Sequence, residues 1–143
     1  MSGLDQQDSL GGVGLPVADI PLDDPRRKAG SDRMKIPTLP FTVTDWSGVP
    51  PTVHLGETGQ ATWRTFTIGD LRVRLVEYSA GYTADHWCDL GHVLYVVEGE
   101  LDTELRDGRT FKLRHGMSYQ VSDRGDAAHR SSTQTGIKLF IID

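Results

Sequence analysis

The chain has 143 residues, 37% hydrophobic and 24% charged, which suits one domain with an ordinary core and is too short for two full-sized domains. Its 20 acidic and 15 basic residues give a net charge of -5, which argues against a nucleic-acid partner because a phosphate backbone needs a concentrated cationic surface. No apolar stretch approaches the roughly 20 residues that cross a bilayer, and no signal-peptide pattern is present. We therefore expect a cytoplasmic protein without a membrane partner.

The first part of the chain is predicted to be an extension. Residues 1–33 show no sustained periodicity and contain three prolines and a Gly-Gly pair, which interrupt regular structure. We expect a flexible N-terminal extension there and a single domain over residues 34–143. Within that domain, residues 36–51 contain four prolines and are expected to pack over it as an extended arm or edge strand.

The remaining sequence favours an all-β fold. Short runs of β-branched and aromatic residues are interrupted by Gly or Asp, as in a β-sandwich or barrel, and no amphipathic helix of convincing length occurs. Gly69, Gly99 and Gly108 stand where hairpin turns are expected. The expected strands cover residues 61–68, 71–79, 86–87 leading on to 91–98, 100–106, 109–113, 117–121, 128–133 and 137–142.

Metal-binding side chains are concentrated in one stretch. His86, Cys88 and His92 are separated by even numbers of residues, so they would share one face of a strand. Imidazole and thiolate are good ligands for first-row metals, and His129, from a later strand, is the natural fourth donor. Two alternatives are a set of buried polar residues that satisfy one another and a reactive Cys88 thiol. We predict a metal site formed by His86, Cys88, His92 and His129.

The metal predicted for three nitrogen donors and one sulfur donor is zinc(II), in a closed tetrahedral arrangement. Iron(II) is the second candidate, and it would need additional water ligands. If all four side chains bind zinc, no open position remains, and the ion would then be structural. Oxygenation requires a redox-active ion, whereas isomerisation or hydrolysis could use zinc, so the identity of the metal would distinguish these classes of reaction.

This pattern resembles the cupin superfamily, whose first motif is G(X)5HXH(X)3,4E(X)6G and whose second is G(X)5PXG(X)2H(X)3N. In the first motif His86 matches the first histidine, Cys88 and His92 stand in place of the second histidine and the glutamate, and Gly99 matches the final glycine. The resemblance implies an antiparallel β-barrel of the cupin type, also called a double-stranded β-helix or jelly roll.

The second motif is matched more loosely. Gly116 fits, Ser122 replaces the proline, Gly125 lies one residue beyond the expected glycine, and His129 lies one residue later than the spacing from Gly125 requires. The string at residues 85–88, Asp-His-Trp-Cys, is similar to the signature of the DHCW subgroup of cupins. That resemblance implies fold and metal, and no particular reaction.

Three further residues are candidates for substrate binding. Arg74 shares a strand face with Arg72, and an inward arginine pair would bind a carboxylate or phosphate; the alternative is a solvated outer face. Glu77 is a possible acid or base, and Tyr119 offers a hydroxyl that would orient a substrate.

Together these features indicate a metal-dependent enzyme that acts on a small polar molecule, with the ion as a Lewis acid or oxygen-activating centre. No catalytic residue is assigned. The alternatives are a non-catalytic small-molecule-binding or sensor cupin with a structural metal, and a metal-free scaffold. A homodimer is expected, because the predicted outward side chains would suit a hydrophobic contact. These side chains are Trp87, Val93, Tyr95 and Val97.

Overall fold

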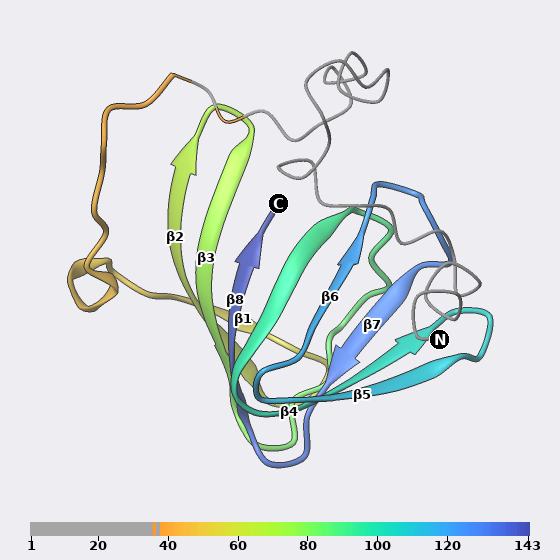
Figure 1. The fold of residues 1–143 in the computed structure, drawn as a ribbon. Helices are drawn as coiled ribbons and strands as arrows, with labels where there is room; N and C mark the ends of the chain where they lie inside the picture. The colour runs from red at the N-terminus through yellow and green to blue at the C-terminus, as the bar shows by residue number, and fades with distance from the viewer. Residues whose placement is uncertain (1–35, 37) are drawn as a thin grey trace, which may run out of the picture. The chain divides into compact units, whose positions relative to one another are not determined.

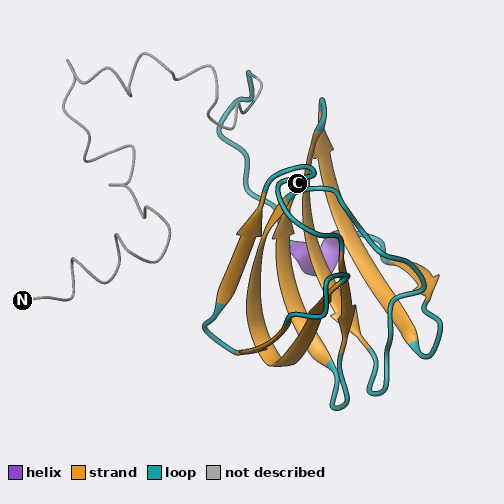
Figure 2. Ribbon diagram, turned by 90° about the vertical axis from the view of Figure 1, so that its right-hand side faces the viewer, coloured by secondary structure: helices purple, strands orange, loops and turns teal. Residues whose placement is uncertain are grey.

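The computed structural model describes residues 36 and 38–143, so the extension predicted for residues 1–33 lies outside the described residues. The described part is built from eight strands and one short 3-10 helix, η3 (Trp46–Gly48) (Figure 2). None of its helices has the length and apolar character needed to cross a membrane. The strands are β1 (Thr52–Leu55), β2 (Gln60–Ile68), β3 (Leu71–Tyr78), β4 (His92–Leu105), β5 (Thr110–Arg114), β6 (Ser118–Val121), β7 (His129–Ser132) and β8 (Ile137–Ile142).

All the pairings between these strands are antiparallel, and β4 belongs to two sheets (Figure 1). The N-terminal half of β4 lies between β8 and β6, and beyond β8 follow β3, β2 and β1. The C-terminal half lies between β5 and β7. The all-β prediction is confirmed, and β4 is the element that connects the two sheets.

The core lies between the two sheets, and every second residue of a strand points into it. In β8 the buried positions alternate with half-buried ones along the whole strand, as expected for a strand with one face on the core. Branched aliphatic side chains fill this space, which is the usual composition of a packed β-core. The fully buried ones are Val76, Leu94, Val96, Leu101 and Leu139.

Gly99 lies inside β4, where the sequence analysis places a turn between two strands. That prediction is wrong, because one strand runs through this position with a shift of register between Val96 and Glu98. Gly99 has a φ of 85°. A glycine at positive φ occurs at irregular positions within strands as well as in turns, and the local sequence does not distinguish the two cases.

Replacing Gly99 by alanine should destabilise the protein by about 2 to 3 kcal/mol, measured by denaturant unfolding. Besides the unfavourable φ, a Cβ atom there would overlap the carbonyl oxygen of Gly136. Gly108 is the matched control, because its φ is 100° and nothing lies within 4 Å of a Cβ built there. Gly108→Ala should therefore cost less than Gly99→Ala, and equal costs would contradict this account of the steric overlap.

The segment before β1 packs on the outer face of the sheet, as expected of an arm, but its described residues form no strand. Trp46 in η3 contacts the ring of Phe140 edge-on, with 6.2 Å between ring centroids. Arg64 Nη1 donates a hydrogen bond to the carbonyl oxygen of Trp46 at 3.1 Å. The strand that follows, β1, was not expected, since its four residues are all exposed and carry no alternating pattern.

Candidate functional site

One cavity, of about 170 Å³, contains all four predicted metal-binding residues in its lining. It lies on the inner side of the strands, next to the aliphatic core. Basic, acidic and phenolic groups line it together, which is unusual for the interior of a small barrel. The polar residues discussed below are Arg72, Arg74, His86, Cys88, His92, Tyr119, His129 and Asp143.

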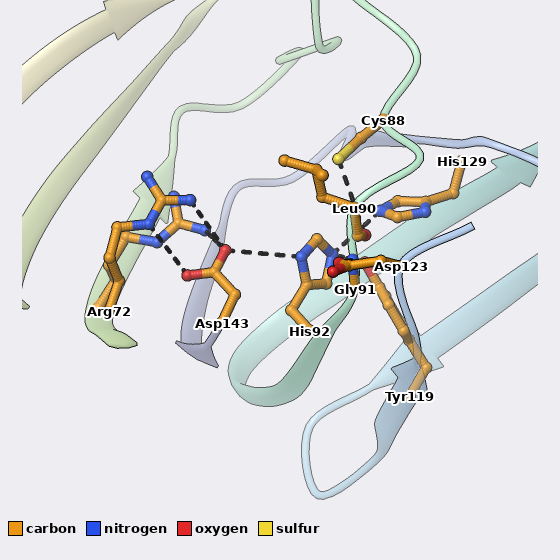
Figure 3. Close-up of polar contacts among 10 residues, drawn as sticks. Arg72, Cys88, Leu90, Gly91, His92, Tyr119, Asp123, His129 and Asp143 are labelled. Atoms are coloured by element: carbon orange, nitrogen blue, oxygen red, sulfur yellow. Dashed lines mark hydrogen bonds and ion pairs between the residues drawn. The ribbon is translucent and has the colours of Figure 1, made fainter. Parts of the chain in front are cut away.

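His92, the first residue of β4, and His129, the first residue of β7, point toward one another (Figure 3). Their Nε2 atoms are 3.0 Å apart, and their rings are nearly perpendicular, at 84°. Two imidazole nitrogens bound to one ion at about 2.1 Å each would be about 3 to 3.4 Å apart. The spacing of these nitrogens therefore fits a shared metal ion.

Cys88 is placed beside His129 by the backbone. The two residues form an isolated antiparallel bridge, in which the N–H of each donates to the carbonyl oxygen of the other at 2.8 Å. Directly opposed residues in such a bridge project from the same face. The sulfur atom is 3.9 Å from the carbonyl oxygen of Leu90 (Figure 3), so it is adjacent to His129 without being bonded to it.

His86 lies at the rim of the cavity, apart from the other donors. Its side chain is 72% exposed, and its Nδ1 is 2.6 Å from Asp85 Oδ1. Residues 86–91 contain only the single bridge at Cys88, so the regular strand on which the shared face depended is not formed there. Among residues 36 and 38–143, no three His, Cys, Asp or Glu side chains are grouped closely enough to hold a metal ion.

Asp143 is the functional candidate that sequence reasoning missed. Its Oδ2 accepts a hydrogen bond from Arg74 Nη2 at 2.7 Å, and Arg72 donates to both of its carboxylate oxygens (Figure 3). Arg74 is 5% exposed, so the arginine pair points inward, but its charges are already matched by this carboxylate. The pairing of β3 with β8 brings Asp143 opposite Arg72, and recognising that pairing would have found it.

The carboxylate of Asp143 stays ionised and lies beside His92. Burial alone would raise the pKa of Asp143, but the contacts with His92 and Arg72 and the charges of both arginines outweigh it and lower that pKa to about 2. Its Oδ2 is 3.7 Å from His92 Nδ1, a buried nitrogen with no hydrogen-bond partner in the described structure. A carboxylate that accepts the Nδ1–H of an imidazole leaves Nε2 as the metal-binding nitrogen, and His92 Nε2 faces Tyr119 and His129.

The electrostatics of the site favour a neutral ring in His129. Burial, followed by the proximity of His92, lowers the pKa of His129. A neutral imidazole is the form that binds a metal ion. Tyr119 contacts the histidine pair, with its hydroxyl oxygen 3.0 Å from His92 Nε2. Burial raises the pKa of the Tyr119 hydroxyl, which therefore keeps its proton.

The structure does not bring Glu77 to this cavity. Its side chain is exposed on the outer face of β3 and lies 3.4 Å from the Lys138 ammonium group. Trp87 also points away from the site, with the guanidinium groups of Arg106 and Arg130 5.4 and 4.7 Å from its ring centroid.

Comparison with known proteins gives likenesses in structure alone. No protein-family model and no curated protein matches the chain. The polyketide cyclase RemF from Streptomyces resistomycificus matches with a TM-score of 0.60 and 20% identity, over 71% of this chain and 78% of its own. Ectoine synthase from P. lautus matches with a TM-score of 0.57 and 14% identity, over 71% and 76%. A cupin superfamily protein from Desulfitobacterium hafniense DCB-2 matches with a TM-score of 0.50 and 14% identity, over 58% and 75%.

Identities this low carry information about architecture and none about chemistry. The likeness to a cupin superfamily protein agrees with the two antiparallel sheets joined through β4. The prediction of fold class is thereby confirmed: the chain has the cupin fold, an antiparallel β-barrel of the double-stranded β-helix type.

Proposed function

We propose that this chain is a metal-binding cupin in which His92 and His129 supply two nitrogen ligands and Cys88 a sulfur ligand. The observation that carries the proposal is the 3.0 Å separation of the two Nε2 atoms. Metal coordination would stabilise the thiolate form of Cys88, which lies on the same side of its bridge as His129. Binding through sulfur requires this side chain to rotate away from the carbonyl oxygen of Leu90.

His86 is the fourth proposed ligand and the one that needs the largest rearrangement. It lines the same cavity as the other three residues, but its Nδ1 is held by Asp85. A carboxylate on one imidazole nitrogen leaves the other nitrogen available for a metal. Zinc(II) suits the complete set of three nitrogens and one sulfur, and iron(II) is the second proposed ion.

The proposed activity is that of an enzyme acting on a small molecule. The ion, when bound, would supply a Lewis acid or an oxygen-activating centre. Tyr119 would orient the substrate, because its protonated hydroxyl lies at the histidine pair. Arg72 and Arg74 hold Asp143 ionised beside His92, and Asp143 would orient the ring of His92 if its carboxylate accepted a hydrogen bond from Nδ1. The names of two structural neighbours, ectoine synthase and polyketide cyclase, are those of enzymes, which supports this reading by analogy of fold only.

A non-catalytic small-molecule-binding or sensor cupin is the second candidate function. It is favoured if all four donors bind the ion, because a closed shell leaves no position for a substrate. The metal would then be structural.

The test is elemental analysis of the full chain, purified without a metal-binding tag. We expect about one metal ion per chain, and a loss of at least tenfold in occupancy in His92→Ala and in His129→Ala. Cys88→Ser should also lose metal. His115→Ala is the matched control, because His115 is exposed and lies outside the cavity. Wild-type metal content in both His92→Ala and His129→Ala would refute the proposed ligands.

Three other expectations remain proposals. A homodimer would use the outer face of β4, where Val93, Tyr95 and Val97 are 37%, 45% and 38% exposed. Trp87 does not contribute to that face in the way expected, because two arginines cover its ring. A cytoplasmic location and membership of the DHCW subgroup stay predictions from the sequence.

A further inference from the structure

A second cavity, of about 340 Å³, adjoins the proposed metal site. Its lining residues come from β4, β5, β6 and β7 and from the segments beside them, and β5 and β6 diverge after the turn that joins them (Figure 1). Tyr119 and His129 line this cavity as well as the first one. The rest of its wall is largely apolar and includes Leu105, Phe111, Leu113, Met117 and Val121.

One polar side chain in this apolar wall has no partner. Thr103, on the inner face of β4, is 5% exposed, and its hydroxyl makes no hydrogen bond in the described structure. Thr133 shows the usual arrangement, since it is 2% exposed and donates to the carbonyl oxygen of Glu100 at 2.7 Å. A buried hydroxyl without a partner is costly. Its oxygen has almost no accessible surface, so a ligand in the cavity would satisfy this hydroxyl once the Thr103 side chain rotates to turn it toward the cavity.

The charged groups at the edge of this cavity are already paired. Arg109 forms ion pairs with Asp107 and Asp126, and the Lys112 ammonium group lies 3.2 Å from Asp102.

Ser118 and Gln120 also line the cavity, and Ser118 Oγ donates to Gln120 Oε1 at 3.4 Å. The cavity therefore offers apolar contact and neutral polar groups, of which the Thr103 hydroxyl is the one buried without a partner. A charged group would lose its hydration there without gaining a counterion, which favours a neutral ligand portion.

We propose that this second cavity holds the apolar part of the substrate, a ring or short branched chain with one hydroxyl or carbonyl oxygen that hydrogen-bonds to Thr103 Oγ1. The more polar end of the same molecule then lies at Tyr119 and His129, the residues common to both cavities. This inference rests on the proposed function and changes the expected substrate from a small polar molecule to an amphipathic one. A volume of about 340 Å³ lies near the lower end of the range of about 300 to 1,000 Å³ for small-molecule sites.

The test uses two probes of nearly equal shape, 2-naphthol and 2-methylnaphthalene, titrated into the full chain and followed by NMR. We expect saturable binding of both to one site. Thr103→Val keeps the side-chain shape and removes the hydroxyl, so it should weaken 2-naphthol binding about five- to tenfold and leave 2-methylnaphthalene unchanged. Thr133→Val is the matched control and should leave the affinity of both probes unchanged. Ala127→Trp, which places a large ring in the cavity lining, should abolish binding of both.

The titrations are run with zinc and again with chelator, so that the cavity is tested separately from the metal. Probe binding that persists in chelator, combined with an elemental analysis that finds no metal in protein purified without chelator, would support the cavity and refute the proposed function. The inference is overturned if neither probe saturates, if Ala127→Trp has no effect, or if Thr103→Val changes the affinity for both probes equally. Loss of stability in Thr103→Val would also contradict it, because removing an unpartnered buried hydroxyl should leave the melting temperature unchanged or higher.

Discussion

Replacing Asp143 by asparagine should destabilise the protein by about 3 to 5 kcal/mol, since a buried cation would lose its counterion. The side chains of Arg74 and Asp143 are 7% and 9% exposed, and Arg74 Nη2 lies 2.7 Å from Asp143 Oδ2. Asparagine keeps the size of the side chain and one oxygen acceptor but removes the charge. Urea unfolding of the metal-free protein measures this effect without a contribution from metal affinity.

Glu77→Gln is the control for the loss of a carboxylate charge. The ion pair of Glu77 with Lys138 is exposed, so its removal should cost less than about 1 kcal/mol. Adding Arg74→Met to the Asp143→Asn protein should recover part of the lost stability, because the unpaired charge is removed as well. If Asp143→Asn cost no more than Glu77→Gln, the buried cluster would not be a stabilising element of the fold.

Zinc should raise the stability of the chain by about 4 kcal/mol when free zinc is a thousandfold above its dissociation constant. For a protein of this size the melting temperature should rise by about 10 °C or more. The reason is that His92 and His129 come from different strands, so the site exists only in the folded chain. Calorimetric scans with zinc and with excess chelator measure the difference.

His129→Ala should show no zinc-dependent rise in melting temperature, whereas His115→Ala should behave like the wild type. An equal rise in the His129→Ala protein would mean that zinc binds elsewhere on the chain. The size of the rise in His86→Ala decides how much that rim residue contributes. A response close to that of the wild type would remove His86 from the proposed ligands.

Local patterns were sufficient to predict most of the strands. Residues 137–142 coincide with β8, and the predicted strand at 61–68 differs from β2 by one residue, because a run of β-branched and aromatic residues is visible in each segment alone. β4 was predicted as two strands because a glycine that permits a register shift has the same local signature as one that permits a turn. That distinction depends on the partner strands β8 and β5, which the local sequence does not reveal.

The candidate site was predicted in part, and for a similar reason. His92 and His129 were selected by residue type, and their strands bring them together. His86 was assigned by a parity that holds only in a regular strand, and the backbone around Cys88 is not one. The burial of Arg74 depends on Asp143, a residue distant in sequence whose role appears only when β3 and β8 are paired. The unpartnered hydroxyl of Thr103 is likewise a property of the folded environment.

Each half of β4 is hydrogen-bonded to a neighbouring strand along both of its edges. Neither sheet can therefore separate from β4 without breaking hydrogen bonds on that strand, which the other sheet shares. Partial opening of this barrel is therefore costly, and its loss of structure should be an all-or-none event. Thr103 and His92 both lie on β4, so a ligand or metal ion bound at either residue should stabilise the whole domain against unfolding.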